Sequence, residues 1–312
     1  MNIIIHEPVM IKEAIKALNI RKNFIYVDAT FGLGGYSRKI LETKGCNLIA
    51  LDRDPDVKKF STSFKKSYKN RFQFILGTFG SLKNILKDKK IENINGGIVA
   101  DLGMSNLQIE DGKRGFSIKN FGPLDMRMSK TGVSAEHVVN FFKENELSDI
   151  LWKYGEEYKS RKIAKRIVYE RKKKKISTTH DLANLVKGVK SNKKPYRIHP
   201  ATKTFQALRI FVNNELEELK NFISDSINLL TPGARLVLIT FHSLEDRLVK
   251  SAFNKVCKKN QTTNRHLPSS DQKIEPKFER VGKSFYFPSS IEVAKNPKAR
   301  SAKLRVIERV SL

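Results

Sequence analysis

The chain has 312 residues and a formal net charge of +28, because 60 Lys or Arg outnumber 32 Asp or Glu. Apolar residues make up 39% of it, which argues for a folded globular protein and against a disordered one. Its two cysteines, Cys46 and Cys257, form no CxxC pair or Cys/His cluster, so we expect neither a disulfide framework nor a metal site.

The sequence also argues against a membrane protein. No run approaches the roughly 20 apolar residues that a membrane span needs, and residues 1–10 lack the apolar stretch of a signal peptide. We therefore expect a soluble, cytoplasmic protein with no membrane partner. The excess of positive charge attracts polyanions at long range, which favours a nucleic-acid partner.

Short apolar strands alternate with helices in the first hundred residues. The pattern predicts strands at residues 24–29, 47–51, 72–76 and 97–101, and helices at residues 9–18, 36–43 and from residue 81, where Ser81 can cap the helix. Such alternation implies right-handed βαβ units and a parallel sheet. The sequence therefore predicts an α/β protein.

The pattern changes between residues 105 and 199, which are rich in helix formers and charge and carry four consecutive lysines at 172–175. We interpret this stretch as an inserted, mainly helical subdomain, so that residues 1–104 and 200–312 form one discontinuous domain. Beyond it, the pattern predicts a helix at 204–230 that breaks near Asn213, a strand at 234–240, a helix at 243–256 and a last strand at 304–310. The polar residues 258–283 are expected to form a mobile loop.

A glycine-rich turn follows the first predicted strand. The strand ends at Asp28; Gly32, Gly34 and Gly35 follow, and Asp52 ends the next strand 17 residues after Gly35. Glycines let the backbone approach a ligand, and an acidic residue at the second strand end can accept hydrogen bonds from ribose hydroxyls. The close glycine spacing does not match GxGxxG, which favours a nucleoside cofactor without a pyrophosphate, such as S-adenosylmethionine, over NAD. A plain βα turn is the structural alternative.

Three further residues stand at predicted strand ends. Phe79 follows the third strand, where an aromatic ring can stack on adenine, although it can equally be a core residue. Asp101 ends the fourth strand, where many amino-methylating enzymes hold the target amine, but the usual Asp/Asn-Pro-Pro-aromatic pattern is absent, and a helix cap is the alternative. His242 follows the later strand and either contacts substrate or serves as a structural hydrogen-bonding group.

Lysine and arginine gather in four segments, at residues 161–166, 171–175, 187–197 and 296–305. A solvated helix face explains any one of them. Together with the overall charge they favour RNA contact, since each Lys or Arg placed on a phosphate releases counterions. The inserted residues 105–199 are therefore expected to bind RNA.

Ten segments of the chain resemble the bacterial MraW family, the cytosine-N4 methyltransferases of small-subunit ribosomal RNA. They are HEPV (6–9), DATFGLGGYS (28–37), LDRDP (51–55), DLGMSNLQ (101–108), RGFS (114–117), GPLDMRM (122–128), YGEE (154–157), HPATKTFQALRIFVNNELEEL (199–219), FHSLEDR (241–247) and NPKAR (296–300). The resemblance covers essentially the whole chain, and the segments at 122–128 and 199–219 are its most specific parts.

The resemblance implies a class I, Rossmann-like S-adenosylmethionine-dependent methyltransferase fold with an inserted helical domain. It implies methyl transfer to N4 of a cytidine in the decoding centre of 16S rRNA, with the small ribosomal subunit as substrate. The cofactor-binding residues that it implies are Gly34, Gly35, Tyr36, Asp52, Phe79, Asp101 and Gln108. Two positions depart from the family pattern. Tyr36 stands where His is usual, which alters a side-chain contact but not a backbone contact, and Ser105-Asn106 replaces a pair of serines.

The residues leave alternatives open. A non-catalytic RNA-binding ribosome-assembly factor would keep the same fold in vestigial form, although Asp52, Asp101 and the glycine turn argue against it. Methylation of DNA or of another small-subunit base is a second alternative. No catalytic base is assigned, and Asp101 or a neighbouring carbonyl is the candidate for orienting the target amine. The sequence does not predict the oligomeric state.

Overall fold

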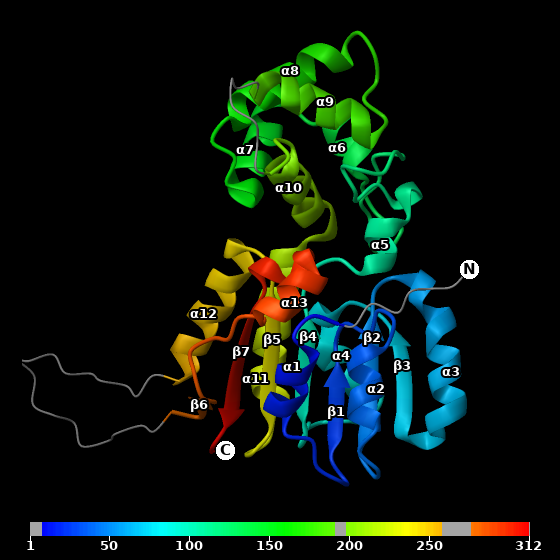
Figure 1. Cartoon of the computed structure of the whole chain (residues 1–312), viewed down its shortest axis with the longest axis vertical. Helices are drawn as coiled ribbons and strands as arrows, with labels where there is room; N and C mark the ends of the chain where they lie inside the picture. The colour runs from blue at the N-terminus through cyan, green and yellow to red at the C-terminus, as the bar shows by residue number, and fades with distance from the viewer. Residues whose placement is uncertain (1–7, 191–197, 258–275, 312) are drawn as a thin grey trace, which may run out of the picture. The chain divides into compact units, whose positions relative to one another are not determined.

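The computed structural model describes residues 8–190, 198–257 and 276–311 (Figure 1). The contacts within the chain divide it into two compact units. The first unit comprises residues 1–103 and 216–312, and the second comprises residues 104–215. The first unit is therefore discontinuous in sequence, and the second is inserted between its two halves.

The first unit is built on a seven-stranded sheet. Its strands are β1 (Ile25–Asp28), β2 (Asn47–Asp52), β3 (Phe72–Leu76), β4 (Gly97–Asp101), β5 (Arg235–Thr240), β6 (Phe278–Arg280) and β7 (Lys303–Arg309). They lie in the order β3-β2-β1-β4-β5-β7-β6, with β1 to β5 parallel and β7 antiparallel to both neighbours. The strand order reverses between β1 and β4, which is the switch point where open α/β sheets bind ligands. The predicted class I, Rossmann-like methyltransferase sheet is thereby confirmed.

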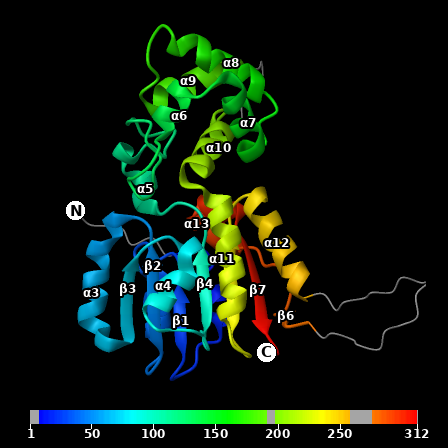
Figure 2. The same ribbon diagram turned by 180° about the vertical axis from the view of Figure 1, so that it is seen from behind.

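Helices cover both faces of this sheet. They are α1 (Ile11–Leu18), α2 (Gly35–Leu41), α3 (Lys58–Tyr68), α4 (Leu82–Asp88), α11 (Glu215–Leu229), α12 (Ser243–Cys257) and α13 (Ser290–Lys295). In Figure 1, α1 and α2 lie in front of the sheet, and in the reverse view of Figure 2, α4 and α11 do. Because both faces are covered, the central strands are apolar on both sides, as in β4, where Ile98, Val99 and Ala100 are all buried.

The second unit is helical. Its helices are α5 (Asn106–Glu110), α6 (Ala135–Phe141), α7 (Glu144–Gly155), α8 (Ser160–Arg171), α9 (Thr179–Lys190) and α10 (Thr202–Asn213). Each of the longer helices is amphipathic and turns its apolar face inward. The shared core contains the buried side chains of Leu151, Ile163, Leu182 and Leu208, from α7, α8, α9 and α10.

The boundary after the inserted stretch differs from the predicted one. Residues 200–215, which the sequence pattern assigns to the methyltransferase part, belong to the second unit. The reason is α10, whose Phe205 and Leu208 are buried in the helical core. Periodicity predicts the helix itself but not the core that it joins. The predicted break is confirmed, because Asn214 has a φ of 51° and separates α10 from α11.

Three elements of the first unit, α3, β6 and α13, are missing from the sequence prediction. The buried residues of α3 are only Ser61 and Phe64, so few apolar residues mark this helix in the sequence. Strand β6 is 3 residues long and lies inside the predicted loop 258–283, of which residues 258–275 fall outside the described residues. The short 3₁₀ helices are η1 (Pro55–Val57), η2 (Lys69–Arg71), η3 (Phe79–Ser81), η4 (Gly112–Arg114) and η5 (Pro297–Ser301). Among the described residues, no helix has the length and apolar character needed to cross a membrane.

Asn213 ties the end of α10 to the loop that follows η4. Its Nδ2 donates to the Met126 carbonyl (2.7 Å), and its Oδ1 accepts from the Met128 N–H (2.8 Å). Replacement by Ala would leave both buried backbone groups unpaired, so we expect Asn213→Ala to lower the free energy of unfolding by about 2–4 kcal/mol.

Asn214→Gly is the matched control, because this exposed neighbour already has the left-handed conformation that glycine adopts freely. Its free energy of unfolding should stay within about 0.5 kcal/mol of the wild-type value. Urea unfolding followed by circular dichroism measures both variants. Equal losses in the two would contradict the role given to the Asn213 side chain.

Candidate functional site

Three aspartates end neighbouring strands of the first unit. Asp28 ends β1, Asp52 ends β2 and Asp101 ends β4. Strand β1 pairs in parallel with both β2 and β4, so the carboxyl ends of the three strands meet at one edge of the sheet. The fold therefore brings together, at the switch point, three acidic residues that the sequence singled out.

The turn between β1 and α2 is shaped by glycines. Gly34 has a φ of 77°, and a Cβ there would lie 2.4 Å from Cζ of Phe64, so a larger residue does not fit. A Cβ on Gly35 would lie 2.1 Å from Cγ of Pro8. Gly32 differs, because no atom of the described residues lies within 4 Å of its Cβ position. The turn is closed by protein at Gly34 and Gly35 and open at Gly32, where a ligand can approach the backbone.

Asp28 is fully buried and locks this turn in place. One carboxylate oxygen accepts a hydrogen bond from Ser37 Oγ (2.7 Å), and the other accepts one from the Thr30 N–H (3.2 Å). Burial raises the pKa of Asp28 to about 6, although the two hydrogen bonds favour the ionised form and lower it. Since Asp28 is fully buried and both of its oxygens accept hydrogen bonds from within the turn, it has a structural role.

Asp52 receives two backbone N–H groups. Its Oδ2 accepts from Gly32 (2.7 Å) and its Oδ1 from Asp54 (2.9 Å). Burial raises the pKa of Asp52 to about 6, against the effect of these hydrogen bonds. Each carboxylate oxygen offers two acceptor positions. Asp52 can therefore accept a further hydrogen bond from a ligand hydroxyl beside the open side of Gly32.

Asp101 is held through its backbone. Its N–H donates to Thr30 Oγ1 (2.8 Å), which ties the end of β4 to the turn after β1. Its carboxylate oxygen Oδ1 is buried and has no hydrogen-bond partner among the described residues. Burial, together with the carboxylates of Asp28, Glu245 and Glu292, raises the pKa of Asp101 well above its usual range. A buried oxygen without a partner is costly, so it marks a position where a ligand donor belongs.

The carboxylates at this edge stand out in a chain whose net charge is +28. They belong to Asp28, Asp52, Asp101, Glu245 and Glu292. Loss of water and mutual repulsion disfavour their ionised forms, and a cationic group placed among them would favour those forms again. The edge therefore suits a positively charged ligand that also carries hydroxyl groups.

Tyr36 lies in α2 with its side chain inside the protein. The ring is buried, and its hydroxyl donates a hydrogen bond to the carbonyl of Val9. Burial also raises the pKa of the phenol well above its usual value. Because the hydroxyl is engaged by the protein, a ligand contact at this position falls to the backbone.

Phe79 begins η3 directly after β3 and is partly buried. Its ring packs on Phe222 of α11, with the ring centroids 5.2 Å apart and the planes at 61°. The next residue, Gly80, donates its N–H to Oε2 of Glu218 (3.0 Å). One side of the Phe79 ring thus belongs to the core, and its exposed part can contact a ligand at the sheet edge.

Gln108 lies in the second unit, apart from the other predicted site residues, which all lie in the first. It is buried in α5, where it forms a capping box with Ser105. Its Oε1 accepts from the Ser105 N–H (3.1 Å), and its own N–H donates to Ser105 Oγ (3.3 Å). These two bonds help to fix the start of α5.

His242 stands immediately before α12. Its Nδ1 accepts from the Glu245 N–H (3.4 Å), and its Nε2 lies 3.0 Å from Oε1 of Glu245. The Glu245 carboxylate in turn accepts from the Phe241 N–H (2.9 Å). These contacts satisfy backbone donors at the start of α12, which is a structural role, while the buried Nε2 of His242 has no hydrogen-bond partner among the described residues.

Residues that the motifs did not mark also shape the site. Thr30 lies within the glycine turn, and its hydroxyl accepts the Asp101 N–H. Glu292 comes from α13, where its Oε1 accepts from the Met10 N–H (2.6 Å). No local pattern marks Glu292, because its place beside Asp101 depends on the fold of the whole first unit. For Thr30, its position two residues after Asp28 was the available signal.

Comparison with known proteins adds to this geometry. The MraW methylase family matches residues 3–310. The ribosomal RNA small subunit methyltransferase H of Ehrlichia canis is 41% identical over 98% of this chain and 100% of its own. That of Rhodospirillum rubrum is 42% identical over 97% of this chain and 94% of its own. Among solved structures, an rRNA methylase from Streptococcus thermophilus aligns over 98% of this chain and 99% of its own, with 11% identity and a TM-score of 0.40.

The electrostatics of Asp28 can be tested through stability. The pKa of its side chain is 3.8 before burial and about 6 in the folded protein. Because the folded protein holds this proton more tightly than the unfolded chain, the free energy of unfolding falls as the pH rises from about 4 to about 6. Asp28 contributes about 3 kcal/mol to this fall. We expect the free energy of unfolding of Asp28→Asn to fall less over this pH range, because the contribution of Asp28 is absent. Urea unfolding at pH 4.5 and pH 7.5 measures the difference, and equal pH dependence in both proteins would contradict the assignment.

Proposed function

The chain belongs to the MraW methylase family, and on that premise we propose that it transfers a methyl group from S-adenosylmethionine to N4 of a cytidine in 16S ribosomal RNA. Within that RNA we propose the decoding centre as the target. The proposal is supported by relatives whose names specify the RNA of the small ribosomal subunit. The single structural observation that carries it is the buried, unpartnered Oδ1 of Asp101 at the end of β4.

The sheet edge fits S-adenosylmethionine. This cofactor has a sulfonium and an ammonium, which are both positive, and ribose hydroxyls, which suit the carboxylates gathered at the edge. Asp52 would accept the ribose hydroxyls, and Phe79 would pack on adenine. The methionine part would approach the turn at Gly32, where it is open, and the family resemblance assigns the backbone of Gly34, Gly35 and Tyr36 to the same part of the cofactor. Gln108 also belongs to the cofactor-binding residues that the family resemblance implies. When bound, the cofactor supplies a methyl group on a positively charged sulfur.

Asp101 is placed to act on the target amine. The exocyclic nitrogen of cytosine is a weak nucleophile because its lone pair is delocalised into the ring. A carboxylate that accepts one N–H of the amine would orient the nitrogen and stabilise the positive charge that grows on it. Oδ1 of Asp101 is available for that hydrogen bond, and it can also take the proton that the methylated amine releases. The bound cation would favour the ionised form of Asp101 that this role requires.

The second unit is the candidate for RNA binding. Residues 159–175 contain ten Lys or Arg and one carboxylate, Glu170. On α8, Arg161, Lys162 and Lys165 are exposed, so they can reach phosphates. The basic segment 187–197 continues beyond α9, although residues 191–197 lie outside the described residues. A base in folded RNA must leave its stack to reach a methyl group, and contacts to flanking phosphates would hold the RNA while it does so. Such a substrate implies action in the cytoplasm.

Methyl transfer to isolated small ribosomal subunits tests the proposed reaction. The subunits come from cells that lack the modification, the methyl group of S-adenosylmethionine is labelled, and nuclease digestion identifies the product. We expect the label in N4-methylcytidine from the decoding centre. Label in another nucleoside would overturn the proposed target. Binding of subunits without any methyl transfer would favour a non-catalytic assembly factor.

Two isosteric variants separate the roles of the aspartates. Asp52→Asn should weaken cofactor binding about 10- to 100-fold, because a charge-assisted hydrogen bond is lost. In the wild type, affinity should fall as the pH drops through about 6, where Asp52 takes up a proton, and part of this dependence should vanish in the variant.

Asp101→Asn serves as the counterpart. It should lower kcat by about 100-fold or more at saturating cofactor, since the group that orients the amine loses its charge. Isothermal titration gives the affinities and single-turnover methylation gives the rates. A fully active Asp101→Asn enzyme would remove Asp101 from the mechanism.

A further inference from the structure

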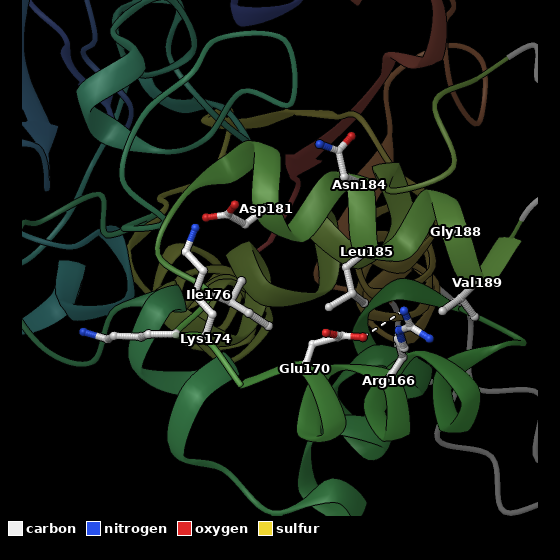
Figure 3. A pocket seen from close by; sticks show the side chains of 10 residues that line it. Arg166, Glu170, Lys174, Ile176, Asp181, Asn184, Leu185, Gly188 and Val189 are labelled. Atoms are coloured by element: carbon white, nitrogen blue, oxygen red, sulfur yellow. Dashed lines mark ion pairs between the residues drawn. The ribbon is translucent and has the colours of Figure 1, made fainter. Parts of the chain in front are cut away.

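A groove with a volume of about 450 Å³ lies between α8 and α9 of the second unit. Figure 3 shows the side chains that face it. Ile176, Leu185 and Val189 provide apolar surface, and Arg166, Lys174 and Asn184 provide charge and hydrogen-bonding groups. All of these residues belong to one unit. We refer to this feature as the α8–α9 groove.

The charges around the α8–α9 groove favour an anionic ligand. Its two carboxylates are already engaged: Glu170 pairs with Arg166 (2.8 Å), and Asp181 accepts from the Thr178 hydroxyl (2.7 Å). Lys174 is exposed and pairs with no carboxylate of the described residues. Lys175, the third cation of the lining, pairs with Glu136 (2.7 Å), and Asp181 keeps its negative charge. The lining therefore carries three cations against two carboxylates, an excess of one positive charge, next to the ten cations at residues 159–175.

Gly188 keeps the α8–α9 groove open. It lies inside α9, where glycine is a poor helix former. Its φ is not positive, and no atom of the described residues lies within 4 Å of its Cβ position. Neither backbone conformation nor packing of the described residues therefore calls for glycine here. Gly188 therefore leaves the backbone of α9 accessible from the α8–α9 groove, where a ligand can approach it closely.

An exposed aromatic ring stands beside these groups. Tyr169 of α8 is 54% exposed, so its ring is accessible to a ligand. The Lys173 ammonium lies 4.1 Å from its ring centroid, and the Arg166 guanidinium lies 5.8 Å from it. Rings flanked by cations are the surfaces on which unpaired bases stack while their phosphates are neutralised. This combination points to nucleic acid rather than to a protein partner.

We propose that the α8–α9 groove receives an unpaired nucleotide of the RNA substrate. The base lies against Ile176, Leu185 and Val189, with its edge toward the Asn184 amide, and Lys174 reaches the adjoining phosphate. This inference rests on the proposed function, which makes RNA the substrate. It adds a second nucleotide site, in the helical unit, to the methyl-transfer site. Such a site would hold RNA mainly by its single-stranded character, since apolar contact accepts any base.

Two substitutions at one position test the proposal in the full-length chain. Gly188→Leu fills the α8–α9 groove, whereas Gly188→Ala adds one methyl group and leaves most of the volume. Both residues are good helix formers, so both variants should melt at or above the wild-type temperature. A fluorescein-labelled single-stranded RNA of mixed sequence is titrated by fluorescence anisotropy. We expect Gly188→Leu to weaken binding about tenfold and Gly188→Ala to leave it unchanged, with cofactor affinity intact in both.

Asn184→Leu provides an independent variant, because it fills the same groove from an exposed helical position. It should also weaken RNA binding. Wild-type affinity in Gly188→Leu and Asn184→Leu, in enzymes that bind RNA and methylate small subunits, would overturn the groove proposal alone. A wild-type chain that neither binds RNA nor methylates small subunits would overturn the proposed function, and the groove proposal with it.

Discussion

Burial of carboxylates at one end of a parallel sheet is the constraint on which the first unit depends. Three adjacent strands end in aspartate, of which Asp28 is fully buried and Asp52 and Asp101 are partly buried. The fold compensates two of them with hydrogen-bond donors, through Ser37 for Asp28 and through backbone N–H groups for Asp52. It leaves one oxygen of Asp101 without a donor. Asp28 therefore fixes the turn, whereas Oδ1 of Asp101 can accept a hydrogen bond from a ligand.

Charge has opposite signs in the two places where ligands are proposed to bind. The sheet edge gathers carboxylates, which suits a small cationic cofactor, while α8 and the residues after it gather lysine and arginine, which suits a polyanion. Both features occur in one chain because each lies in a separate compact unit. The net charge of +28 therefore reflects the surface that is proposed to bind RNA and gives no sign of the acidic sheet edge.

Much of this architecture could be predicted from local sequence. The buried strands of the sheet are continuous apolar runs, so β3 and β4 have the predicted bounds, and the aspartates at the strand ends mark the site. Local patterns failed where structure depends on distant partners. Helix α3 has few buried residues, α10 joins a core that its own periodicity does not specify, and Glu292 reaches the site from near the end of the chain.

The inserted second unit has a consequence for synthesis on the ribosome. Strand β4 needs β5 beside it, and the two strands pair from Gly97 with Arg235 to Asp101 with Ile239. Residues 104–215 are synthesised after β4 and before β5, so β4 lacks its neighbour β5 while the helical unit is being completed. The helical unit is contiguous and can assemble as it emerges, because domains generally fold as units during synthesis. Glu245 and Glu292, which complete the acidic edge, are made only after β5. The helices proposed to contact RNA are therefore complete before the proposed methyl-transfer site is.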